Sequence, residues 1–169
     1  MLRRAPFLLL LALVAACAGG GAFEGGVLRK GELAVQLGPV PAAWHAVAIA
    51  GADLAWRDAA RDGSALFDVR CEGRDRDAPL GVLTEHLIMG TTERDFTTQD
   101  VVAFDHREAL HTLMRAKLDG VPMQYDIYVM KKDGCVYDLV YVAPPERFPA
   151  GAEDFERFAR GVHAASAER

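Results

Sequence analysis

Serine is scarce in this chain of 169 residues, which contains only Ser64 and Ser166. Neither serine lies in the G-x-S-x-G motif that presents the nucleophile of many hydrolases. The sequence also lacks the G-x-x-x-x-G-K-[ST] loop that holds nucleotide phosphates, and the glycines near Gly19 do not follow a strand pattern. We therefore expect neither a serine hydrolase nor a protein with one of these nucleotide-binding motifs.

Basic residues are also too few to make the chain a nucleic-acid-binding protein. The sequence has 19 lysines and arginines against 24 acidic residues, a net charge of −5. An acidic chain without a basic stripe is a poor partner for nucleic acid, and it lacks the polybasic patch that attracts anionic lipid headgroups. Its main apolar run, Phe7 to Ala16, spans ten residues, whereas a membrane-spanning helix needs about 20.

That short apolar run belongs to an N-terminal pattern typical of secretory signals. Arg3 and Arg4 precede it, and small residues close it at Ala15 and Ala16. Because Cys17 follows directly, the segment Leu13-Val14-Ala15-Ala16-Cys17 resembles the lipobox of bacterial lipoproteins. The resemblance implies that residues 1–16 are removed and that Cys17 is acylated. The alternative is an ordinary signal peptide with an incidental cysteine.

Acylation of Cys17 would anchor the protein to a membrane through its N-terminal acyl chains, since each buried methylene contributes about 0.8 kcal/mol. Ala18 follows in place of Asp, which favours the outer over the inner membrane by the enterobacterial sorting pattern. We therefore expect a periplasm-facing protein of the bacterial cell envelope. The glycine-rich residues 17–29 are expected to be a flexible tether, and residues 30–165 a single domain.

Two cysteines remain if Cys17 carries lipid. Cys71 and Cys135 form an even pair in an oxidising compartment, which favours a disulfide, and the alternative is two buried free thiols. With only two thiols and scattered histidines we expect no metal site. The histidines are read as surface residues, and no catalytic residue or cofactor is predicted; they are His45, His86, His106, His111 and His163.

Hydrophobic periodicity predicts mostly strands. They are expected at residues 32–37, 44–49, 53–57, 65–71, 101–104, 109–118, 123–130 and 135–142. Residues 109–118 also fit a helical face, but Asp119-Gly120 is a hairpin turn signal and favours the strand. One helix is expected from a cap at Asp77 to a stop at Gly90, and a second over residues 152–164.

The strand over residues 135–142 is apolar on both faces except at Asp138. This pattern predicts a central strand covered on both sides, so the expected fold is α+β with an antiparallel sheet covered by helices. A carboxylate in such a strand must reach water or a partner, and Arg57, Arg70 or a backbone donor are the candidates.

The order of these elements resembles the Mog1/PsbP-like fold, a layered sandwich. The chain is also similar to a group of small bacterial envelope lipoproteins. The segments that carry the likeness are Leu54-Ala55-Trp56-Arg57, Asp77-Ala78-Pro79-Leu80, Leu118-Asp119-Gly120 and Gly134-Cys135-Val136-Tyr137-Asp138-Leu139-Val140-Tyr141. Since PsbP-like proteins act as assembly or accessory factors, the resemblance implies a non-enzymatic role and an envelope protein as partner.

Two functions follow as hypotheses. The first is a membrane-anchored envelope lipoprotein that binds another protein as an assembly or accessory factor. The second is a carrier of a lipid or other apolar ligand, which needs a cavity between helix and sheet. An enzyme with an unrecognised site is the remaining alternative. Trp56, Tyr137 and Asp138 are the residues expected to contact a partner or ligand.

Overall fold

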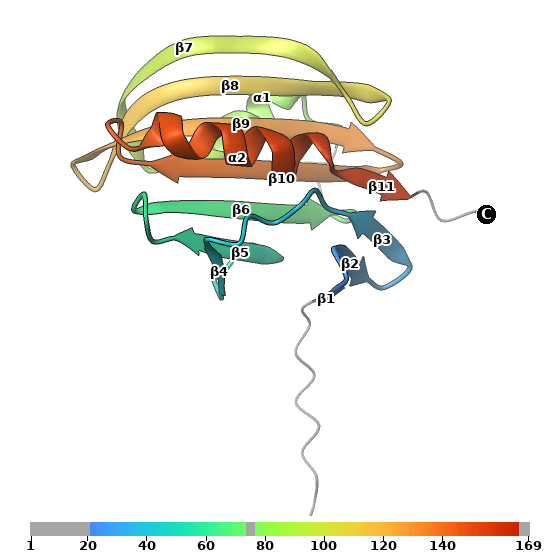
Figure 1. The fold of residues 1–169 in the computed structure, drawn as a ribbon. Helices are drawn as coiled ribbons and strands as arrows, with labels where there is room; N and C mark the ends of the chain where they lie inside the picture. The colour runs from blue at the N-terminus through green and yellow to red at the C-terminus, as the bar shows by residue number, and fades with distance from the viewer. Residues whose placement is uncertain (1–20, 74–76, 166–169) are drawn as a thin grey trace, which may run out of the picture.

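A seven-stranded antiparallel sheet forms the centre of the protein, seen in a computed structural model that describes residues 21–73 and 77–165 (Figure 1). Its strands lie in the order β4 (Trp44–Val47), β5 (Leu54–Asp58), β6 (Gly63–Arg70), β10 (Cys135–Ala143), β9 (Val121–Lys132), β8 (Arg107–Leu118) and β7 (Thr91–Phe104). A second, smaller sheet contains β1 (Ala22–Glu24), β2 (Val27–Lys30), β3 (Leu33–Gln36) and β11 (His163–Ala165).

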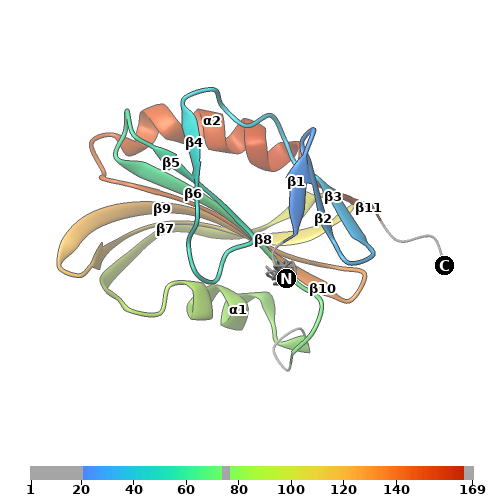
Figure 2. The ribbon, with the colours of Figure 1, turned by 90° about the horizontal axis from the view of Figure 1, so that it is seen from below.

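The large sheet is covered by one helix on each face. Helix α2 (Phe148–Arg160) lies on one face and α1 (Leu80–Leu87) on the other, as the view from below shows (Figure 2). In β10, the side chains of Tyr137, Leu139 and Tyr141 pack into the core on the α2 side. Val136, Val140 and Val142 pack with the α1 cluster instead. The predicted central strand is therefore confirmed, because both faces of β10 meet apolar neighbours.

The core beneath α2 is largely aromatic. Phe155 and Phe158 of α2 are fully buried, and the ring of Trp56 meets that of Phe158 edge-on with centroids 5.4 Å apart. Trp56 is 3% exposed and Tyr137 1% exposed. Neither ring is therefore at the surface, because both pack inside the core, and their contact with a ligand stays a prediction.

The predicted hairpins are present. Asp119-Gly120 joins β8 to β9 and Asp133-Gly134 joins β9 to β10, all four with positive φ angles between 51° and 81°. This geometry suits two-residue turns and explains the Asp-Gly pairs. Residues 109–118 lie within a strand, as expected. The disulfide between Cys71 and Cys135 is formed, with an S–S distance of 2.02 Å, and ties the end of β6 to the start of β10.

Several boundaries differ from the sequence expectations. Residues 22–30 form the β1–β2 hairpin, so the tether expected over residues 17–29 is folded from residue 22 onward. The turn at Gly25-Gly26 has φ angles of 58° and 80°, which glycine adopts at no steric cost. Cys17 and the expected signal peptide lie outside the described residues.

Both helices begin at other residues than predicted. The N-cap of α1 is Pro79 and no side chain caps it, so the expected cap at Asp77 is wrong. Helix α2 starts at Phe148 with Pro149 in its first turn, a position where proline needs no hydrogen-bonded N–H. The helix ends at Arg160, and residues 163–165 pair with β3 instead of continuing it.

Candidate functional site

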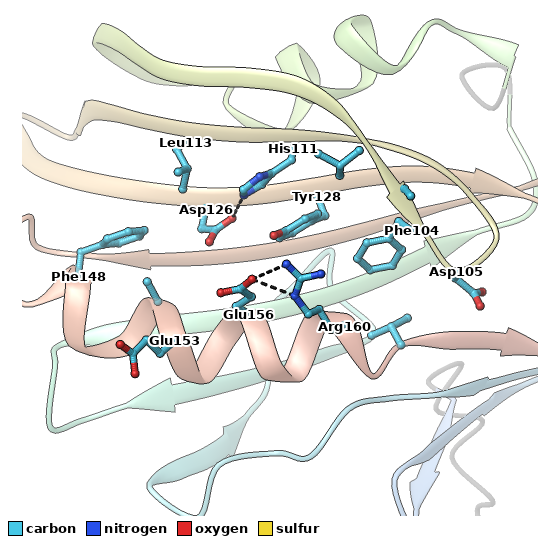
Figure 3. Close-up of a pocket in the computed structure, with 14 residues that line it drawn as sticks. Phe104, Asp105, His111, Leu113, Asp126, Tyr128, Phe148, Glu153, Glu156 and Arg160 are labelled. Atoms are coloured by element: carbon cyan, nitrogen blue, oxygen red, sulfur yellow. Dashed lines mark hydrogen bonds and ion pairs between the residues drawn. The ribbon is translucent and has the colours of Figure 1, made fainter.

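An open groove runs between α2 and strands β7 to β9, with a volume of about 600 Å³ (Figure 3). We call it the α2 groove. Its lining is a mixture of apolar and charged side chains: Val102, Ala103, Phe104, Asp105, His111, Leu113, Asp126, Tyr128, Phe148, Ala152, Glu153, Glu156, Arg160 and Val162.

The groove exists because α2 covers only part of the sheet. The helix packs on β6, β10 and β9, and strands β8 and β7 continue beyond it (Figure 1). The buried stripe of α2 includes Phe155 and Phe158. Glu153, Glu156 and Arg160 follow at positions i, i+3 and i+7, so they form a neighbouring stripe that borders the open part of the sheet.

The sheet wall of the groove carries a histidine–aspartate pair. His111 of β8 lies opposite Tyr128 of β9 in the strand register, and Asp126 is two residues from Tyr128. His111 Nε2 lies 2.8 Å from Asp126 Oδ1. The imidazole stacks on the Tyr128 ring with centroids 4.1 Å apart and an angle of 7° between the planes. Stacking and hydrogen bond together fix the orientation of the imidazole.

Burial governs the electrostatics of this wall. It raises the pKa of Asp126, the hydrogen bond and charge of His111 oppose that shift, and the charge of Glu156 adds to it. Burial likewise raises the pKa of Tyr128 well above its usual value, and the charge of Asp126 contributes. Both shifts disfavour the charged forms of Asp126 and Tyr128. A partner group that brings positive charge or a hydrogen-bond donor to this wall would therefore stabilise the charged carboxylate.

Three other charged groups of the groove, Glu156, Arg160 and Asp105, are already paired. Glu156 accepts from Arg160 with a distance of 2.6 Å, from Nη2 to Oε1. Asp105 accepts from Lys132 Nζ at 2.6 Å, and its other oxygen lies 3.0 Å from His163 Nδ1. Burial alone would raise the pKa of Asp105, but the hydrogen bonds from Lys132, His163 and the Ala164 N–H outweigh it and lower the pKa.

The groove combines apolar walls with a few oriented polar groups. Among the described residues that line the groove there is no serine, threonine, cysteine or lysine. Apolar walls with a few oriented polar groups are typical of binding sites. Within residues 21–73 and 77–165, no three or more His, Cys, Asp or Glu side chains gather in a way that could hold a metal ion.

Asp138, the third residue expected to make contacts, faces the opposite side of the sheet. Its Oδ2 lies 2.6 Å from Arg70 Nη2, so one of the candidate partners named from the sequence is the actual one. Arg57 instead contacts Asp62. The structure therefore does not bring Trp56, Tyr137 and Asp138 together in one site.

Sequence reasoning missed His111 and Asp126. The reasoning applied to Asp138 could have found Asp126, because Asp126 is also a carboxylate within an apolar strand, between Tyr125 and Ile127. The strand period then places His111, Asp126 and Tyr128 on one face of the hairpin. His111 was read as a surface residue because its spacing from His106 fits no metal motif.

Comparisons with known proteins bear on the fold. A scan against protein-family models found no match, and neither did a search of curated proteins by sequence. None of the described helices has the length and apolar character needed to cross a bilayer.

Solved structures do match. The solution structure of cyanobacterial PsbP (CyanoP) from Synechocystis superposes with a TM-score of 0.56 at 13% identity, covering 74% of this chain and 84% of that one. LpqN of Mycobacterium tuberculosis, described as involved in cell envelope biogenesis, gives 0.55 at 9% identity, with 78% and 84% covered. A Bacteroides thetaiotaomicron protein gives 0.54 at 9% identity, with 79% and 45% covered. The chain therefore folds as a PsbP/Mog1-like domain, as its sequence predicts.

Proposed function

We propose that this protein is a membrane-anchored envelope lipoprotein that binds another protein as a non-enzymatic assembly or accessory factor, and that the α2 groove is the contact surface. The observation that carries the proposal is the groove itself. Its sheet wall presents the oriented His111–Asp126 pair beside apolar side chains such as Leu113, open to solvent between helix and sheet. A protruding segment of a partner could bury apolar side chains there and donate to the buried carboxylate.

Two further observations support this role. The lipobox at Cys17 and the absence of a recognised catalytic motif favour work done by contact at a membrane. The structural neighbour LpqN is described as involved in cell envelope biogenesis. At 9% identity the likeness concerns the fold. The description of LpqN agrees with an envelope role for this chain but does not identify a partner.

Site-specific photocrosslinking in living cells tests the proposal. A photoreactive phenylalanine analogue replaces Ala103, which is exposed and lines the groove, or Arg157 on the outward side of α2, whose side chain is 62% exposed. We expect a discrete protein adduct from position 103 and none from position 157. Equal labelling at both positions, or none at position 103, would contradict a groove-bound partner.

A second pair of variants tests whether the crosslinked adduct depends on the surface of the α2 groove. Leu113→Glu places a charge in the groove, and Val82→Glu places the same charge on α1, where Val82 is 44% exposed. We expect Leu113→Glu to abolish the adduct at position 103 and Val82→Glu to preserve it. If Val82→Glu abolished the adduct and Leu113→Glu preserved it, the partner would contact the α1 face instead.

A ligand carrier is the second candidate, because the volume of the groove, about 600 Å³, is within the range of small-molecule sites. Native mass spectrometry after gentle extraction separates the two functions. A co-purifying apolar molecule that Leu113→Glu removes would favour the carrier. A ligand-free domain, together with the crosslinked adduct, would favour the protein-binding factor.

A further inference from the structure

A second, smaller pocket lies on the opposite face of the sheet, beside α1. Its volume is about 230 Å³, and we call it the α1 trough. Its lining comes from the sheet floor, the end of α1 and the loop before β5: Gly51, Ala52, Leu66, Asp68, Arg70, Leu87, Met89, Thr91, Leu118, Tyr125, Asp138, Val140 and Val142. It shares no lining residue with the α2 groove.

The strand register shows how the floor of the trough is built. Along β10, Asp138, Val140 and Val142 follow at every second residue and so face the same side. Asp138 pairs with Asp68 and Val140 with Leu66 on β6, and Val142 pairs with Tyr125 on β9. The floor therefore runs from a carboxylate end through an apolar middle to a tyrosine, over roughly 13 Å for four strand residues.

The carboxylate end of the trough has more negative than positive charge. Arg70 is the cation that contacts both acids, with Nη1 2.5 Å from Asp68 Oδ2 and Nη2 2.6 Å from Asp138 Oδ2. Asp138 is 2% exposed, and its Oδ1 atom is buried without a hydrogen-bond partner. One guanidinium between two carboxylates leaves a net charge of about −1, and a buried carboxylate oxygen without a donor is costly.

The far end of the trough carries a second unpaired group. The Tyr125 hydroxyl is buried and makes no hydrogen bond within the described residues, and the side chain of Tyr125 is 7% exposed. The rim, in contrast, is open and apolar: Met89 is 71% exposed and Leu118 42% exposed. A ligand bound in this accessible apolar trough could supply the hydrogen-bond partners that the polar groups at its two ends lack.

We propose that the α1 trough binds a small amphiphilic amine, with its ammonium group on Asp138 Oδ1 and its apolar chain over Leu66, Val140 and Val142. An ammonium group supplies hydrogen-bond donors and the missing positive charge together. A carboxylate at the same place would face Asp68 and Asp138 and be repelled. Burial raises the pKa of Asp138 to about 6, although the charge and hydrogen bond of Arg70 oppose the shift, so the single guanidinium does not offset the loss of hydration of this carboxylate.

Octylamine, octanol and octanoate are matched probes that differ in the head group. The full-length lipoprotein is placed in lipid nanodiscs with ¹³C-labelled methionine methyl groups. Met89 on the rim reports binding in the trough, and Met130, buried on the α2 side, reports the fold. The nanodisc lipid also takes up octylamine, but to the same extent in every sample. Protein variants can therefore be compared at the same total octylamine concentration.

We expect octylamine to shift the Met89 signal saturably, octanol to bind more weakly and octanoate not to bind. Asp138→Asn keeps the shape and removes the charge, and should weaken octylamine binding about tenfold or more. Asp58→Asn is the matched control, since it changes a buried carboxylate on the α2 side that lines neither pocket. The proposal fails if octanoate binds as well as octylamine, or if both variants change binding equally. It also fails if Asp138→Asn binds as well as the wild type with an unchanged Met130 signal.

Discussion

The Tyr141 hydroxyl donates a hydrogen bond of 3.2 Å to Asp58 Oδ2 beneath helix α2. Arg61 contacts the same carboxylate at 3.0 Å and reaches Asp154 of α2 at 3.2 Å. This network joins β10, the end of β5 and the helix, and so fixes the position of α2 over the sheet. Gly151 is the helix residue that makes the close approach possible, because a Cβ there would lie 1.8 Å from the Tyr141 hydroxyl.

Gly151→Ala should therefore destabilise the protein although alanine is the better helix former. The added methyl group meets the Tyr141 hydroxyl and ring, and the helix or the tyrosine must move. We expect the free energy of unfolding to fall by about 1–3 kcal/mol, measured by urea denaturation followed by circular dichroism. An unchanged or higher unfolding midpoint would show that α2 does not sit as closely on Tyr141 as described.

Gly81→Ala is the matched change in the other helix. A Cβ at Gly81 meets no heavy atom within 4 Å, so only the helix propensity changes. The same urea experiment should show a gain of up to about 1 kcal/mol. A loss of stability at both glycines would mean that neither effect comes from the contact with Tyr141.

The disulfide leads to a prediction about thiol reactivity and stability. In the unreduced wild type, Cys71 and Cys135 should not react with a thiol reagent under denaturing conditions. Cys71→Ala should release one reactive thiol at position 135. The bond closes a sequence separation of 64 residues, so its loss should lower the free energy of unfolding by roughly 4 kcal/mol. Labelling of both cysteines without reductant would contradict the bond.

Much of the large sheet could be read from the sequence because apolar periodicity and turn chemistry agree there. Strands β8 to β10 alternate in polarity or are apolar on both faces, and Asp-Gly pairs mark their turns. Strand β7 shows the limit of this reasoning. Its residues 92–101 are exposed, so the sequence has no buried face to reveal, and pairing with β8 keeps the strand in place. Sequence reasoning therefore predicted only residues 101–104 of it.

In the small sheet only β3 was predicted, as the strand expected at residues 32–37, and its partners were missed for another reason. Strands β1 and β11 are three residues long, and β11 pairs with β3, more than 120 residues earlier in the chain. Such a pairing depends on where α2 ends and not on local pattern. At that end the two backbones lie close together, because a Cβ on Gly161 would lie 2.4 Å from Gly38 Cα. Only the folded chain brings these two glycines together.

The candidate sites were predictable in part. A carboxylate in an apolar strand must reach water or a partner, and Arg70, which contacts Asp138, was one of the three candidates that the sequence offered. The His111–Asp126 pair was not, since it depends on the register between β8 and β9. A one-residue shift of that register would place the two side chains on opposite faces of the sheet.

The proposed membrane anchor gives a prediction that does not depend on the fold. Cys17→Ser removes the thiol that we propose to be acylated, so the protein should move from the membrane fraction to the soluble periplasmic fraction. Fractionation with immunoblotting measures this, and Cys71→Ala provides a control that alters a cysteine without touching the lipobox. Membrane fractionation of Cys17→Ser like that of the wild type would refute the anchor.

The last prediction concerns the pH dependence of stability at Asp138. Burial raises the pKa of this carboxyl from 3.8 to about 6, although Arg70 lowers it. The native state therefore holds the proton more tightly than the unfolded chain does, and wild-type stability falls as pH rises from about 4 to about 6. Asp138→Asn removes this loss. The variant should match the wild type near pH 4 and exceed it by about 1–3 kcal/mol above pH 6.

Urea denaturation at pH 4, 5, 6 and 7.5 measures the difference between the two proteins, and Glu32→Gln, at an exposed turn position, is the control that should change little at every pH. A stability gain above pH 6 would show that the wild type retains a charge that weakens its own fold. A buried carboxylate whose charge lowers the stability of the fold is a pattern expected of a binding site. A loss of stability above pH 6 would instead show that Asp138 serves the fold through Arg70, which would remove the basis for the amine site in the α1 trough.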